Sequence, residues 1–91
     1  MNTRRSKIQI LYDMLRFIQS AELAKPTHIM YKANLSYQRF KKYLELLEEK
    51  EFVTKIKKKR STYFQITEKG RKFVRSFRQV QEFSEAFGLP I

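Results

Sequence analysis

Cysteine is absent from the 91-residue sequence, which also has a single histidine, His28, and a single aspartate, Asp13. The lack of cysteine excludes disulfide bonds, thiolate nucleophiles and most zinc sites. A lone imidazole and a lone aspartate leave little material for a catalytic triad, a metal cluster or a paired-carboxylate site. We therefore expect a protein that is not an enzyme and that binds neither a cofactor nor a metal.

Glycine, proline and long apolar runs are scarce as well. Two glycines and two prolines do not make the composition of a linker or a disordered tail. No apolar run approaches the ~18 residues of a membrane-spanning helix, and the polar start Met1–Arg5 does not resemble a signal peptide. These features predict one small cytoplasmic domain with a modest core and no membrane partner.

Acidic residues are outnumbered: nine Asp and Glu stand against 20 Lys and Arg, which gives a net charge of +11. Such an excess of positive charge repels itself in a folded domain, so a polyanionic partner explains it. Nucleic acid is the first candidate for that partner. An anionic membrane surface is the second, and the absence of a long apolar run counts against it.

Apolar periodicity predicts three helices in the first half of the chain. Residues 6–9 fit a capping box that begins the first helix. A short second helix is expected over residues 27–33 and ends at Asn34, because asparagine tolerates a left-handed backbone. Ser36 is expected to cap a third helix over residues 37–50. The inward side chains of this third helix are expected to be Phe40, Tyr43 or Leu44, and Leu47.

A β-hairpin and a fourth helix are predicted in the second half. Alternating β-branched and aromatic residues indicate strands at residues 52–57 and 62–66. Residues 58–61 lack glycine, so we expect a loop of four or more residues between the strands. Thr67 is expected to cap a long helix that ends at Gly88. The order of elements predicts a mainly helical α+β fold, the winged helix-turn-helix, with the hairpin as its wing.

Three segments resemble a known family. Residues 29–37 (IMYKANLSY) and 42–47 (KYLELL) resemble the archaeal winged-helix family of small DNA-binding regulators and chromatin-type proteins. Residues 63–70 (YFQITEKG) look like the strand-to-helix junction of many winged-helix regulators. The resemblance extends over about residues 6–80. It implies a homodimer held together by the C-terminal helices, often as an antiparallel coiled coil.

Two features depart from that family pattern. Glu51 stands where such sequences often have glycine, at the turn into the first strand. A non-glycine residue costs up to ~1 kcal/mol there if the backbone is left-handed. The C-terminal helix is also shorter than in the long coiled-coil members and is rich in phenylalanine rather than leucine, so the dimer geometry of the family does not transfer directly.

The first half of the third helix is the predicted DNA-reading surface. In a helix-turn-helix, the N-terminal part of the second motif helix enters the major groove, and its free amides attract phosphate. Gln38 either reads adenine or remains solvated, and Tyr37 either contacts a phosphate or packs against the first helix. The residues of this segment expected to contact DNA are Ser36, Tyr37, Gln38, Arg39, Lys41 and Lys42.

Charge is unevenly distributed along the same helix. Its first half carries Arg39, Lys41 and Lys42, whereas its second half and the following turn carry Glu45, Glu48, Glu49 and Glu51. Acids near a helix C-terminus oppose the helix dipole, so helix stability does not explain this order. An orientation with the first half towards a polyanion does explain it.

The hairpin and the N-terminus carry further cations. The hairpin loop and the strand ends beside it consist mostly of basic residues and of residues with hydroxyl side chains. Those expected to contact DNA are Lys55, Lys57, Lys58, Lys59, Arg60, Ser61 and Thr62. The alternative is a hairpin whose lysines only maintain solubility or protect a strand edge. Arg60 is the candidate for minor-groove insertion. Arg4 and Arg5 belong to a basic arm, residues 1–5, which either follows the DNA backbone or is disordered.

The last helix has more apolar residues than a domain of this size needs. Phe73, Val74 and Phe77 are expected to close the core against the first helix. Val80, Phe83 and Phe87 lie beyond the expected end of the compact domain and would form an exposed apolar patch. A soluble monomer rarely tolerates such a patch, and pairing of two chains across a two-fold axis buries it. The predicted dimer interface consists of Phe77, Val80, Phe83 and Phe87.

These observations predict a double-stranded DNA-binding protein that acts as a homodimeric regulator of transcription. The predicted parts are a basic arm (1–5), a winged-helix domain (6–72), a helix for core closure and dimerisation (67–88) and a tail (89–91). The alternatives are a non-specific architectural protein of the nucleoid, a basic RNA-binding protein, and a winged helix used only for protein contacts. A winged helix used only for protein contacts would be expected to carry fewer cations on its wing and third helix.

Overall fold

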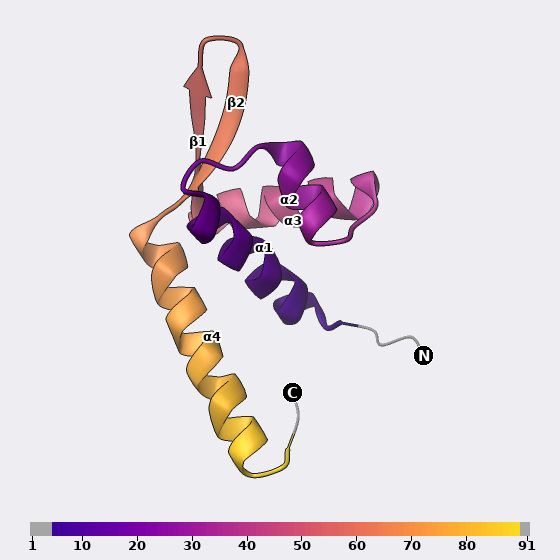
Figure 1. Cartoon of the computed structure of the whole chain (residues 1–91), viewed down its shortest axis with the longest axis vertical. Coiled ribbons are helices and arrows are strands. Elements are labelled where there is room, and N and C mark those ends of the chain that lie inside the picture. The colour runs from indigo at the N-terminus through magenta and orange to yellow at the C-terminus, as the bar shows by residue number, and fades with distance from the viewer. Residues whose placement is uncertain (1–4, 90–91) are drawn as a thin grey trace.

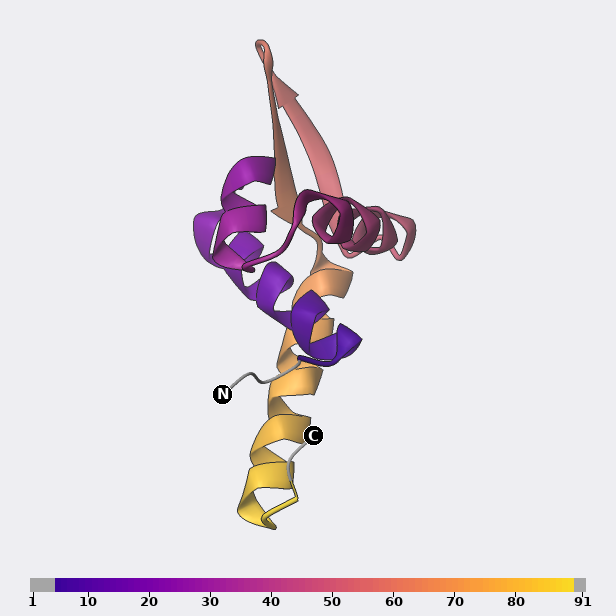
Figure 2. The ribbon, with the colours of Figure 1, turned by 90° about the vertical axis from the view of Figure 1, so that its right-hand side faces the viewer.

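The computed structural model describes residues 5–89 and confirms the predicted order of elements. The elements are α1 (Lys7–Ala21), α2 (Pro26–Lys32), α3 (Tyr37–Glu49), β1 (Val53–Lys58), β2 (Ser61–Ile66) and α4 (Glu68–Ala86). In Figure 1 the β1–β2 hairpin and the free end of α4 project in opposite directions from a body formed by α1, α2 and α3. Helix α3 lies on one side of α1 near the foot of the hairpin, as Figure 2 shows.

Hydroxyl side chains set the starting points of three helices. Ser6, Ser36 and Thr67 each accept a hydrogen bond from a backbone amide three residues ahead, at 3.2, 3.3 and 3.0 Å. Such caps satisfy amides that the helix itself leaves unpaired. The expected capping box at α1 forms only in part, because the Gln9 amide side chain donates to Asp13 instead of returning to Ser6.

The core is built around α1. Ile10, Met14, Leu15 and Ile18 are almost completely buried along one broad face of this helix. Burying one such side chain contributes about 1.5–3 kcal/mol relative to leaving it exposed. The inward side chains expected on α3 are buried as well, and both Tyr43 and Leu44 point inward.

A backbone pairing outside the two predicted strands connects the wing to the helices. The Ala24 amide donates to the Phe64 carbonyl at 2.9 Å, and the Phe64 amide donates to the Ala24 carbonyl at 2.8 Å. Ala24 lies two residues before the start of α2. This pairing therefore holds the start of the helix-turn-helix against the base of β2.

The expected loop of four or more residues is wrong. Lys58 pairs with Ser61, so only Lys59 and Arg60 connect the strands. A two-residue turn needs backbone angles that glycine or asparagine adopts most readily, and here Lys59 takes them, with φ of 54°. The tighter turn lengthens both strands by one residue towards the tip.

The junction between α3, β1 and α4 is closely packed. Glu51 has a left-handed backbone, with φ of 63°, and its carbonyl accepts a hydrogen bond from the Thr67 hydroxyl at 2.7 Å. A Cβ atom at Gly70 would lie 2.3 Å from the Phe52 carbonyl oxygen. Gly70 is thus required by the close approach of α4 to the turn, whereas Glu51 occupies a position that would suit glycine.

Glu51→Gly is expected to raise the free energy of unfolding by up to about 1 kcal/mol. It removes the strain of a non-glycine residue in a left-handed conformation, and the Glu51 side chain that is lost is exposed. Chemical denaturation measures this change. Gly70→Ala is the opposing control and is expected to destabilise the fold by the clash with Phe52. A loss of stability in Glu51→Gly would contradict the interpretation of the turn.

Candidate nucleic-acid interface

The first half of α3 presents a continuous polar surface to solvent. Phe40 and Tyr43 anchor the helix to the core. All six residues predicted for this contact surface are exposed: Ser36, Tyr37, Gln38, Arg39, Lys41 and Lys42. The Tyr37 side chain is 64% exposed, so of its two predicted environments the structure shows the solvent-facing one and not packing against α1.

Aromatic and acidic neighbours position the cations of α3 and β1. The Arg39 guanidinium and the Lys42 ammonium lie 5.8 and 5.9 Å from the centre of the Tyr43 ring, within the range of cation–π attraction. At the other end of the helix, the Lys55 ammonium lies 3.9 Å from a Glu48 carboxylate oxygen. Within residues 5–89, no carboxylate lies within 4 Å of the charged groups of the cations on the first half of α3, whereas Glu48 on its second half already faces Lys55 of β1.

The tip of the wing is the second exposed basic surface. Lys57, Lys58, Lys59 and Arg60 are exposed, and within residues 5–89 no carboxylate lies within 4 Å of their charged groups. The register pairs Lys57 with Thr62 and Lys58 with Ser61, so each of these lysines on β1 lies opposite a hydroxyl residue on β2. The tip can accordingly offer both charge and neutral donors to phosphate oxygens.

The structure places Arg5 differently from the predicted basic arm. Its guanidinium donates to the Asp13 carboxylate at 2.8 Å and to the Ala33 carbonyl, and its side chain is only 30% exposed. This cation ties the start of α1 to the end of α2 instead of extending towards a ligand. Arg4 lies outside the described residues.

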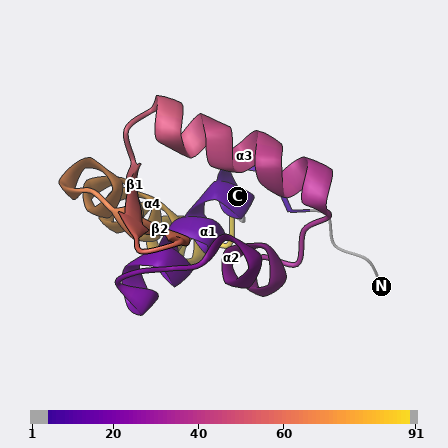
Figure 3. The same ribbon diagram turned by 90° about the horizontal axis from the view of Figure 1, so that it is seen from above.

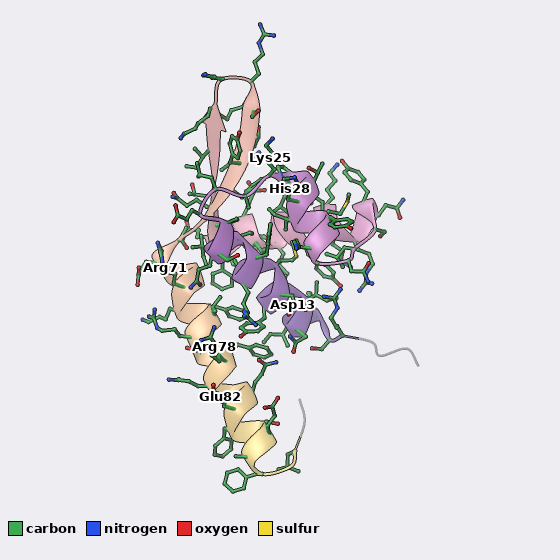
Figure 4. The ribbon with its side chains drawn as sticks, in the orientation of Figure 1. Asp13, Lys25, His28, Arg71, Arg78 and Glu82 are labelled. Carbon is green, nitrogen blue, oxygen red and sulfur yellow. The ribbon has the colours of Figure 1, made fainter. Side chains whose placement is uncertain are left out.

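Three exposed residues, one just before α2 and two on it, were not among the contact residues predicted from the sequence. Figure 4 shows Lys25 and His28 beside the lower part of the wing, and both are exposed. Tyr31 is 81% exposed and lines a shallow hollow at the helix-turn-helix corner. The signal for Tyr31 was its position between the inward residues Ile29 and Ala33, which puts it on the outer face of a helix.

The apolar residues of α4 divide into two groups. Phe77 is 6% exposed and packs on Tyr12 with ring centres 4.8 Å apart. Val80, Phe83 and Phe87 are 51%, 67% and 65% exposed, and we call these three residues the apolar stripe. Phe77 is thus occupied within its own chain, and the surface that α4 can offer to a second chain starts beyond it.

Neither a metal centre nor a membrane segment is visible in the part of the chain that the structure describes. Residues 5–89 contain no group of three or more His, Asp or Glu side chains arranged to share a metal ion. Within the same range, no helix combines the length and the apolar character that crossing a bilayer requires.

Known proteins and a family model are similar to this chain in sequence. A family model described as winged helix-turn-helix matches residues 4–85. An uncharacterised protein of Methanocaldococcus jannaschii is 35% identical over 79 residues, which cover 87% of this chain and 76% of that protein. A second uncharacterised protein of the same organism is 39% identical over 54 residues, 59% of this chain, and the match spans only a quarter of its own length.

Solved structures show the same architecture. Sso10a-2, a DNA-binding protein from Sulfolobus solfataricus, has a TM-score of 0.79 at 23% identity, and the match covers 91% of this chain and 85% of Sso10a-2. Streptococcus pneumoniae FabT, solved in complex with DNA, has a TM-score of 0.67 at 18% identity, with 87% and 59% of the two chains covered. The family match over most of the sequence, together with the archaeal relative, shows that this chain belongs to the winged helix-turn-helix family.

Proposed function

We propose that this chain binds double-stranded DNA in the cytoplasm as a homodimeric transcriptional regulator. The first half of α3 enters the major groove, and the tip of the wing contacts the backbone or the minor groove. The observation that carries the proposal is the placement of charge. Uncompensated cations gather on the first half of α3 and on the wing tip, which is the electrostatic footprint expected of a nucleic-acid-binding surface.

The similar folds support this proposal without deciding the role. Sso10a-2 is a DNA-binding protein, and FabT was solved in complex with DNA. Both proteins differ from this chain at more than three quarters of the aligned positions. Within the interface, we assign base reading to Gln38 and Lys41, an assignment that their exposure on the first half of α3 supports. Lys57, Lys58, Lys59 and Arg60 are placed to contact phosphates.

The apolar stripe supports the dimer. Val80, Phe83 and Phe87 are exposed near the C-terminal end of α4, and that end of the helix extends away from the body in Figure 1. The Phe83 and Phe87 rings already lie against each other, with centres 4.8 Å apart. Apolar side chains at such exposure are buried at low cost by a second copy of the same helix across a two-fold axis. A dimer would also carry two α3 helices, one for each half-site of a duplex.

A non-specific architectural role is the alternative that the same surfaces allow. Selection of bound sequences from random duplex DNA distinguishes the two roles, because a regulator enriches a two-fold motif and an architectural protein enriches none. Structured RNA used as a competitor addresses the third possibility. RNA that displaces duplex DNA at equal or lower concentration would replace the proposal with an RNA-binding role.

Duplex affinity is expected to fall by ~10³–10⁵ between 50 and 200 mM salt if about 6–10 phosphates are contacted per dimer. The quadruple variant Lys57→Ala, Lys58→Ala, Lys59→Ala and Arg60→Ala should weaken binding to every sequence and reduce the salt slope. Fluorescence anisotropy at several salt concentrations measures both effects. Lys50→Ala with Lys69→Ala, two exposed lysines outside the interface, is the control. A nearly flat salt dependence of the wild type would rule out the proposal.

Phe83→Glu is expected to convert a dimer into a monomer, because it introduces a charge into the apolar stripe at a side chain that makes few contacts in its own chain. Light scattering at micromolar concentration measures the mass of both forms. Phe83→Leu keeps an apolar side chain and is expected to remain dimeric. A wild-type protein that is monomeric under these conditions would refute the dimer.

A further inference from the structure

Half of the eight arginines of the sequence lie on α1 and α4 and not on α3 or the wing. We call these four residues, Arg16, Arg71, Arg75 and Arg78, the arginine band. Arg16 and Arg78 line one groove of about 260 Å³ between α1 and α4, together with the polar side chains of Gln19 and Ser20. A neighbouring hollow shares Arg16 and Ser20 and continues to Lys32 on α2. It is also lined by Phe17 and by Asp13, an acid that is paired with Arg5.

Two guanidinium groups of the band are held at the same aromatic side chain. Arg16 lies 5.8 Å from the centre of the Tyr12 ring. A hydrogen bond to the Tyr12 hydroxyl raises the pKa of Arg78, and the charge of Glu82 adds to this effect. Figure 4 shows Arg78 and Glu82 along α4. Holding like charges in fixed positions around one groove is unfavourable unless an anion is bound there.

The acids near the band offset only part of its charge. Glu68, which is 82% exposed, lies 3.9 Å from Arg71, an arrangement that contributes little at a surface. Asp13, on the neighbouring turn of α1, is already paired with Arg5. Within residues 5–89, no carboxylate lies within 4 Å of the charged groups of Arg16, Arg75 or Arg78.

The order of charges along α4 is also unfavourable for an isolated helix. Residues 68–78 carry five cations and one acid, whereas the last turns carry Glu82 and Glu85 and no cation. Cations near the N-terminus and acids near the C-terminus both oppose the helix dipole. As in α3, helix stability does not account for this order, and a bound polyanion at the cationic half does.

The band is separate from both surfaces of the proposed function. At 100° per residue, Arg71, Arg75 and Arg78 fall within a narrow arc of α4 on the side opposite the centre of the apolar stripe. Viewed from above in Figure 3, α3 lies on one side of α1 and α2 on the other. The hollow that runs from Arg16 to Lys32 on α2 therefore lies on the side of α1 that faces away from α3.

We propose that the arginine band is a second contact surface for the phosphate backbone of duplex DNA, so that one chain can hold two duplex segments on opposite sides. The proposal rests on the DNA binding proposed above for α3 and the wing. Arginine suits phosphate because its planar fork donates two hydrogen bonds at once. Arg71 and Arg78 are about 10 Å apart along the helix axis at 1.5 Å per residue, which exceeds a single small anion and matches a stretch of backbone.

The test is capture of a fluorescent duplex by a bead-bound duplex of a different sequence, each about one helical turn long. All variants carry Phe83→Glu, so that each particle has a single α3 and a single wing and cannot bridge through a dimer. The key variant adds Arg71→Gln and Arg75→Gln, neither of which belongs to the buried core. The matched control adds Lys7→Gln and Lys50→Gln, which remove the same charge at exposed positions outside the band and outside α4.

The Phe83→Glu chain is expected to capture the second duplex. Arg71→Gln with Arg75→Gln should reduce this capture about tenfold by the loss of phosphate contacts while affinity for the first duplex, measured by anisotropy, changes little. Capture that is unaffected by these substitutions, or absent while the first duplex still binds, overturns the second surface and leaves the proposed function standing. Loss of all duplex binding by the wild type overturns both. Thermal stabilisation by inorganic phosphate without capture also overturns the proposal, because it indicates a small-anion site.

Discussion

The burial of α1 is the constraint on which the rest of the domain depends. Its apolar face is wide enough to contact α2, α4 and β2 together, and its central residues Met14, Leu15 and Ile18 are inaccessible to solvent. Each neighbouring element therefore has only one face left for other purposes. The polar face of α3, the wing tip, the far end of α4 and the arginine band are among the surfaces that this packing leaves free.

Electrostatics then divides those free surfaces by sign. Glu48 faces Lys55 at the foot of the wing, and Asp13 binds Arg5 near the start of α1. These two acids thus compensate cations near the start of α1 and at the base of the wing, while the wing tip keeps its positive charge. In a protein with a net charge of +11, concentrating the cations on exposed surfaces costs free energy because the like charges repel each other. A bound polyanion removes that cost.

Local signals were read correctly from the sequence. Hydroxyl caps at Ser6, Ser36 and Thr67 and the left-handed Asn34 depend on residues within a few positions of each other. Glu51 was recognised as a position that favours glycine, and it is left-handed. Periodicity likewise identified the inward face of α3, because burial repeats with the period of the helix.

Features that depend on contacts between distant parts of the chain were not predicted. The pairing of Ala24 with Phe64 and the bond from Arg5 to Ala33 join segments far apart in sequence. Lys59 adopts a conformation that its residue type disfavours, because the strands on either side fix the turn. The packing of α4 on α1 was expected from the apolar residues of α4, but the convergence of Arg16 and Arg78 also depends on how the two helices are aligned, which no local pattern indicates.

The central claim is that α3 and the wing tip form the primary contact with duplex DNA. Amide chemical shifts in an ¹⁵N-labelled sample, followed as duplex is added below one equivalent per chain, test it most directly. The account predicts that the earliest and largest changes occur at residues 36–42 and 57–62. Changes confined to other parts of the chain, with these two segments unaffected while the duplex is bound, would contradict it.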